Sequence, residues 1–129
     1  MATNKIGLNH YTISVKDVDI SIIFYRDILG LETIKRPSFD FKGAWFEVGN
    51  LIQLHLIEDV ETQIAPSGSR SLHFAFHVEN VLSFYDFLIS KGIEIVKDIK
   101  SRPDGVLQFY IKDPDGYYIE ITEYATKTE

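Results

Sequence analysis

Two histidines separated by a regular interval are the first candidates for metal chemistry in this chain. His10 and His73 lie 63 residues apart, and the same interval separates Val15 from Val78, which indicates an internal duplication. Equivalent positions of a duplicated chain converge when the two halves pack about a pseudo-twofold axis. Because imidazole nitrogens bind divalent transition metals, the histidine pair predicts a metal site.

A carboxylate and an amide form a second pair of polar positions. Gly49 and Gly116 mark the last hairpin of each half, and their separation of 67 residues places Gln53 on Glu120. A carboxylate on an otherwise apolar strand needs a partner, so we predict Glu120 as a metal ligand and as the catalytic base. The simpler alternative is a glutamate that faces solvent.

His55 competes with Gln53 for the role of fourth ligand. The two are two residues apart, so both side chains point to the same face of one strand. The duplication favours Gln53, whose amide oxygen is a weak neutral ligand, whereas histidine chemistry favours His55 as a ligand or as a catalytic proton carrier. A polar lining without a metal is the alternative for both.

The elements that position these residues follow the order βαβββ in the first half. Residues 8–15 alternate as in a strand, Asp17 can cap an amphipathic helix, and Gly30 can end it. Further strands are predicted at residues 32–36, 43–48 and 51–57.

The second half repeats this order after a polar linker at residues 58–70. A strand at 71–78 precedes a helix at 81–90, and strands follow at 93–96, 106–111 and 117–122. We predict one α+β domain over residues 1–129, with module one at about 5–57 and module two at about 71–124. The two tandem βαβββ modules should form a curved mixed sheet cup with the helices packed outside.

Composition limits the partners of this domain. The chain of 129 residues has 13 basic and 19 acidic side chains and a net charge of −6, which argues against nucleic acid. It has no cysteine, no signal peptide pattern and no apolar run that could span a membrane, so we expect a cytoplasmic protein.

The segments GLNHYTISVKDVDISIIFYRDILGLE, HFAFHVEN and FYIKDPDGYYIEI resemble the vicinal-oxygen-chelate superfamily, which includes glyoxalase I, fosfomycin-resistance and bleomycin-resistance proteins and dioxygenases. The resemblance extends from Gly7 to Glu123 and is greatest to glyoxalase-like proteins. It implies metal ligands on the first, fourth, fifth and last strands, which are His10, Gln53, His73 and Glu120. Bacterial glyoxalases have a glutamate where this chain has Gln53.

The resemblance also implies a reaction. A divalent ion (Ni, Zn, Co, Mn or Fe) would bind two adjacent oxygens of a small-molecule substrate while Glu120 moves a proton, as in a glyoxalase-like lyase or isomerase. An acyl-CoA epimerase and a metal-free, drug-sequestering binding protein are the alternatives, and a homodimer is expected. Candidates for the substrate wall are Arg36, Phe39, Phe41, Trp45 and Arg102.

Overall fold

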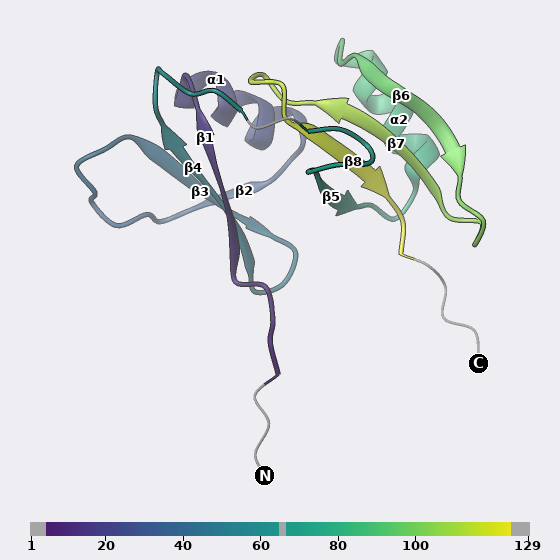
Figure 1. Ribbon diagram of the computed structural model, residues 1–129, viewed down its shortest axis with the longest axis horizontal. Helices are drawn as coiled ribbons and strands as arrows, with labels where there is room; N and C mark the ends of the chain where they lie inside the picture. Colours follow the sequence, from purple (N-terminus) through teal and green to yellow (C-terminus); the bar gives the residue numbers. More distant parts are fainter. Residues whose placement is uncertain (1–4, 65–66, 125–129) are drawn as a thin grey trace. The chain divides into compact units, whose positions relative to one another are not determined.

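The computed structural model describes residues 5–64 and 67–124, and the chain divides into two compact units (Figure 1). Unit 1 is Met1–Thr62 and unit 2 is Gln63–Glu129. Each unit has one four-stranded mixed sheet and the element order βαβββ, so the predicted α+β fold with two tandem modules is confirmed. In the described residues, no helix is both long and apolar enough to cross a membrane.

The sheet of unit 1 has the strand order β1-β4-β3-β2, and only its β1–β4 pair is parallel. This order places the first and last strands of the unit side by side, with His10 opposite Gln53 in the ladder. The elements of unit 1 are β1 (His10–Val15), α1 (Val18–Ile22), η1 (Ile23–Ile28), β2 (Glu32–Ile34), β3 (Gly43–Val48) and β4 (Ile52–Glu58).

The sheet of unit 2 has the equivalent order β5-β8-β7-β6, again with one parallel pair, β5–β8 (Figure 1). Ala75 of β5 is opposite Glu120 of β8 in that pair. The elements of unit 2 are β5 (Phe74–His77), α2 (Val81–Ser90), β6 (Ile95–Ser101), β7 (Leu107–Lys112) and β8 (Tyr118–Thr122).

Both helices begin in the same way. The predicted cap Asp17 accepts hydrogen bonds from the N–H groups of Asp19 and Ile20, and Asn80 accepts one from Ser83 at the start of α2. Such caps satisfy backbone donors that the first turn of a helix leaves without partners.

A carboxylate from the last strand of each unit completes the helix start. Oε2 of Glu58 accepts a hydrogen bond from the N–H of Val18 at 3.1 Å, and Oε2 of Glu123 accepts one from the N–H of Val81 at 2.9 Å. A negative charge at a helix N-terminus also interacts favourably with the helix dipole. The contact therefore ties the helix of each unit to its last strand.

The first helix departs from the predicted regular pattern. After the five residues of α1, the chain continues as a π-helix, η1, and the N–H of Leu29 bonds to the carbonyl of Phe24 at 3.0 Å. Phe24 and Tyr25 are consecutive, and both are buried within this segment. A wider turn of this kind breaks the 3.6-residue period, which is why the sequence pattern did not reveal it.

Alternation along the strands separates a core face from a polar face in each sheet. In unit 1 the buried residues Leu54 and Leu56 flank His55, and in unit 2 the buried residues Ile119 and Ile121 flank Glu120. Because neighbouring side chains of a strand point to opposite faces, His55 and Glu120 lie on the faces away from these apolar residues.

The final hairpins correct one predicted equivalence. Val48 is opposite Ile52 in the β3–β4 hairpin, and in unit 2 the N–H of Asp113 bonds to the carbonyl of Tyr117 at 3.0 Å. Both turns thus contain three residues, 49–51 and 114–116, and the paired strands are shifted by 65 residues instead of 67.

The residue that corresponds to Glu120 is therefore His55, and the predicted match of Gln53 with Glu120 is wrong by two positions. The parallel ladders agree, because Thr12 is opposite His55 and Ala75 is opposite Glu120, and Thr12 and Ala75 are 63 residues apart. The predicted interval of 63 between the first strands is retained.

Candidate functional site

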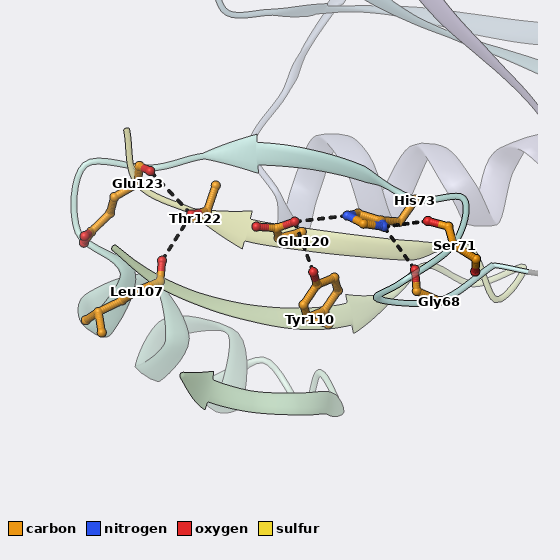
Figure 2. A network of polar contacts seen from close by, with 8 residues as sticks. All are labelled: Gly68, Ser71, His73, Leu107, Tyr110, Glu120, Thr122 and Glu123. Atoms are coloured by element: carbon orange, nitrogen blue, oxygen red, sulfur yellow. Dashed lines mark hydrogen bonds and ion pairs between the residues drawn. The ribbon is translucent and has the colours of Figure 1, made fainter. Parts of the chain in front are cut away.

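His73 and Glu120 face each other in unit 2 (Figure 2). Nε2 of His73 lies 3.1 Å from Oε1 of Glu120. His73 immediately precedes β5, and Glu120 lies in the neighbouring strand β8, so the parallel pair brings together two residues that are distant in the sequence. Glu120 is only 8% exposed, where a carboxylate without partners would be costly.

The second nitrogen of His73 decides what this pair can bind. Nδ1 lies 3.0 Å from the carbonyl oxygens of both Gly68 and Ser71 (Figure 2). Since a carbonyl oxygen only accepts, Nδ1 carries the proton of the neutral ring, and Nε2 is left as an acceptor. Nε2 therefore faces a carboxylate oxygen that is also an acceptor, an arrangement that calls for a proton or a cation.

The donor set and its spacing fit a divalent metal ion. Nitrogen and oxygen ligands about 2.1 Å from an ion lie about 3 Å apart when the angle at the ion is near a right angle. The separation of 3.1 Å between Nε2 of His73 and Oε1 of Glu120 agrees with that geometry. The backbone carbonyls that orient the imidazole are partners of the kind that metal-binding histidines use on their second nitrogen.

Tyr110 holds the carboxylate from the adjacent strand. It is opposite Glu120 in the β7–β8 ladder, and its hydroxyl donates a hydrogen bond of 3.1 Å to Oε1 of Glu120 (Figure 2). Burial, followed by the charge and hydrogen bond of Glu120, raises the pKa of Tyr110 to about 12. Tyr110 therefore stays protonated and acts as a donor at neutral pH.

Sequence reasoning did not identify Tyr110, although one signal was present. The Asp113–Gly116 turn fixes how β7 and β8 pair, and counting outward from it places Tyr110 opposite Glu120. A correct count across the hairpin identifies both the missed tyrosine and the register of the last strand.

Arg102, a predicted wall residue, forms an ion pair within its own turn. Its Nε lies 3.1 Å from Oδ1 of Asp104, and that hydrogen bond is the main reason why the pKa of Asp104 is lowered. The positive charge of Arg102 opposes the rise in the pKa of Tyr110. Arg102 thus acts on the Glu120 cluster electrostatically while its fork is occupied by Asp104.

In unit 1 the polar face carries a stack of rings. Trp45 lies parallel to His55 with ring centroids 4.0 Å apart, and His10 lies against the other side of His55 at 4.2 Å. These residues come from β3, β4 and β1, three neighbouring strands of one sheet. The structure therefore brings the predicted ligand His10 together with His55.

Gln53 is engaged by the same histidine. Nε2 of His55 lies 2.8 Å from Oε1 of Gln53, so the imidazole donates to the amide oxygen. Burial lowers the pKa of His55, and the charges of His10 and Arg36 lower it further, which favours the neutral ring. His10 has its own partner, because its Nδ1 lies 2.7 Å from Oδ1 of Asn9.

The predicted residues thus form two groups, one in each unit: His10 with Gln53 and His55, and His73 with Glu120. Within either unit, the described residues contain no cluster of three or more His, Asp or Glu side chains suited to hold a metal. Each unit by itself supplies part of the predicted ligand set.

The family is shown by comparison with known proteins. Residues 7–121 match the model of the Glyoxalase/Bleomycin resistance protein/Dioxygenase superfamily. The chain is 33% identical to glyoxylase I 4 of Arabidopsis thaliana over 89% of this chain and 69% of that protein. It is 30% identical to the metallothiol transferase FosB of Bacillus licheniformis, over 94% of this chain and 78% of that protein.

The fold is also shared with solved structures. A crystal structure of a Bacillus anthracis protein assigned to the glyoxalase family has a TM-score of 0.79 and 31% identity, covering 95% of this chain and 98% of that one. The tandem βαβββ units, the match over residues 7–121 and these relatives agree. The chain belongs to the Glyoxalase/Bleomycin resistance protein/Dioxygenase superfamily.

Proposed function

We propose that this protein is a metal-dependent, glyoxalase-like lyase or isomerase that binds a small substrate through two adjacent oxygens and moves a proton. The proposed ligands of the divalent ion are His10, His73 and Glu120. Gln53 and His55 are the candidates for a fourth ligand, and His55 is also a candidate proton carrier. The identity of the ion, among Ni, Zn, Co, Mn and Fe, is part of the test.

The observation that carries this proposal is the contact between two acceptors in unit 2. Nε2 of His73 and Oε1 of Glu120 are 3.1 Å apart while Nδ1 of His73 is committed to backbone carbonyls. Nitrogen and carboxylate oxygen together are a ligand set typical of catalytic transition-metal sites. The match to relatives named glyoxylase I 4 and metallothiol transferase FosB supports the same chemistry.

When bound, a divalent ion polarises the oxygens of a substrate carbonyl and makes the neighbouring C–H more acidic. The proton is then moved by Glu120, which is within the same cluster. Oε1 of Glu120 is engaged by Tyr110 and His73, so we assign the proton transfer to Oε2. Tyr110 keeps the carboxylate in position during transfer, because its own proton is held up to a pKa of about 12.

The main alternative is an epimerase that acts on an acyl thioester. It is favoured by Gln53, a neutral amide at a position where bacterial glyoxalases have a glutamate. The amide oxygen of Gln53 already accepts from His55, which weakens it further as a ligand. Both reactions use the same proton-moving Glu120, so substrate assays must separate them.

Metal analysis of protein purified without an affinity tag tests the requirement for an ion. The proposal predicts close to one equivalent per chain. Less than about one-tenth of an equivalent, unrestored by added nickel, cobalt, zinc, manganese or iron, would favour a metal-free binding protein that sequesters a small molecule.

Turnover assays then test the reaction. The methylglyoxal–glutathione adduct should be converted, whereas a methylmalonyl thioester should be converted only by an epimerase. Glu120→Gln should lower kcat by at least about a hundredfold, because it removes the general base. Glu94→Gln, at an exposed glutamate of unit 2, is the control and should keep full activity. Full activity of Glu120→Gln would remove this residue from the mechanism.

A homodimer is part of the proposal. Duplicated modules of this kind can pair within a chain or between two copies, and a symmetric dimer is the commonest soluble assembly. Sedimentation should give about twice the chain mass of 14.8 kDa. A monomer at all concentrations would remove this element of the proposal and leave the chemistry of His73 and Glu120 unaffected.

A further inference from the structure

A row of five aromatic rings runs along unit 1 and ends at His10. Phe41 stacks on Phe39 with centroids 5.0 Å apart, and Phe39 lies 6.2 Å from Trp45. Trp45 then stacks on His55 at 4.0 Å, and His55 on His10 at 4.2 Å. We define these five residues as the ring row. Such contacts are in the range where aromatic pairs attract one another.

Arg36 fixes the phenylalanine end of the ring row. Its guanidinium carbon lies 4.8 Å from the ring centroid of Phe39 and 5.0 Å from that of Phe41. Nη2 of Arg36 also donates a hydrogen bond of 2.9 Å to the carbonyl of Phe41. Cation–π contacts and a backbone hydrogen bond together hold this segment in one conformation.

Gly43 leaves room for this arrangement. A Cβ at position 43 would lie 2.9 Å from Nη2 and 3.0 Å from Cζ of Arg36, and 2.3 Å from the carbonyl oxygen of Leu56. A side chain at position 43 would therefore displace Arg36 from the two phenylalanines. The absence of a side chain here is a requirement of the packing around Arg36.

The ring row combines order with exposure. Phe39 is 45% exposed and Phe41 is 40% exposed, although both are held by Arg36. Phenylalanine gains most from burial, so two ordered and half-exposed rings next to a candidate metal ligand are suited to a bound molecule. The flat faces of the rings select for a flat apolar group.

We propose that the ring row is a binding subsite for a planar, aromatic substituent of the substrate, with Phe39 and Phe41 as its specificity-determining residues. The inference rests on the proposed function only in that His10 holds the oxygen-bearing end of the substrate. The substrate class is thus an aryl-substituted compound with two adjacent oxygens, such as an aryl 2-oxo acid or its adducts.

A pair of 2-oxo acids tests this subsite without turnover. Benzoylformate and pyruvate share the same adjacent oxygens and differ in having a phenyl or a methyl group. Their dissociation constants are measured by calorimetric titration of the protein as purified. The wild type should bind benzoylformate at least about tenfold more tightly than pyruvate, as expected for added aromatic contacts.

Three variants assign the preference to the phenylalanines. Phe39→Ala/Phe41→Ala should reduce the ratio of the two dissociation constants to within about twofold of unity and leave pyruvate binding unchanged. Phe39→Leu/Phe41→Leu keeps apolar bulk but no rings, and it carries the test if the alanine variant does not fold. Phe87→Ala is the matched control, because Phe87 is also 40% exposed but belongs to α2 of unit 2.

The outcomes separate this inference from the proposed function. An aryl preference that disappears in the leucine or alanine variant supports the subsite, even in a protein that turns over no glutathione adduct. Equal affinity for the two acids, no binding of benzoylformate by the wild type, or a preference that persists in both double variants would overturn it. Loss of the preference in Phe87→Ala would also contradict it.

Discussion

At the scale of single residues, Tyr110 offers a hydrogen bond that can be removed while its ring is kept. The hydroxyl donates to Oε1 of the buried Glu120 at 3.1 Å. Tyr110→Phe should lower the free energy of unfolding by about 1–2 kcal/mol, because a buried carboxylate loses one of its donors. Urea unfolding measures this change, and Tyr118→Phe on the neighbouring strand is the control. Equal stability of the two variants would show that Glu120 does not depend on Tyr110.

Asp98 provides a test of pH dependence away from the proposed metal ligands. A hydrogen bond from the N–H of Ile99 lowers the pKa of Asp98, and a second from the hydroxyl of Tyr85 adds to this effect. Because the folded pKa is lowered, the stabilisation is complete above the unfolded pKa, about 4, and is lost as the pH falls through the folded pKa.

Tyr85→Phe should therefore make the thermal midpoint less sensitive to acid. The variant lacks one donor to Asp98, so its pKa should lie closer to the unfolded value and less stability should be lost on acidification below about pH 4. Thermal unfolding at a series of pH values between neutrality and that range measures the difference. Parallel curves for wild type and variant would mean that Tyr85 does not influence Asp98.

At the scale of elements, the β3–β4 turn contains a leucine in an unfavourable backbone conformation. Leu51 has φ 68°, and its side chain is 84% exposed. Leu51→Gly should raise the free energy of unfolding by about 0.5–1 kcal/mol, because glycine adopts positive φ without the Cβ clash and little burial is lost. Gly49→Ala, at φ 65°, should have the opposite effect. A lower thermal midpoint for Leu51→Gly would refute this account of the turn.

The same turn explains where sequence reasoning failed. Glycine is the usual marker of a positive φ, so Gly49 was matched to Gly116, yet the residue equivalent to Gly116 is Leu51. That choice shifted the last strand by two residues and placed Gln53, instead of His55, on Glu120. Residue type alone does not reveal where a hairpin closes, because tertiary packing can force a leucine into a conformation that it disfavours.

Other elements could be predicted because their patterns are local. The helix at Val81–Ser90 and the cap at Asp17 follow from apolar periodicity and from a side chain that accepts from the first turn. The π-helix Ile23–Ile28 and the ring row were not visible, since both depend on contacts between residues from different elements. Register and ring stacking are properties of the folded sheet.

At the scale of the whole molecule, duplication has been followed by divergence of equivalent positions. His10, His55 and Trp45 of unit 1 correspond to His73, Glu120 and Tyr110 of unit 2. The first set forms a stack of rings, whereas the second joins two acceptors through a buried carboxylate. One unit is thus suited to hold a flat apolar group and the other to hold a cation and move a proton.

Titration of metal-stripped protein with a divalent ion, followed by calorimetry, tests directly whether His73 and Glu120 are metal ligands. The wild type and Glu94→Gln should bind close to one equivalent per chain. His73→Ala, Glu120→Gln and His10→Ala should each bind at least about tenfold more weakly, because each removes a proposed ligand. If His73→Ala and Glu120→Gln bind the ion as tightly as the wild type, or if the wild type binds none, these two residues are not the metal ligands of this protein.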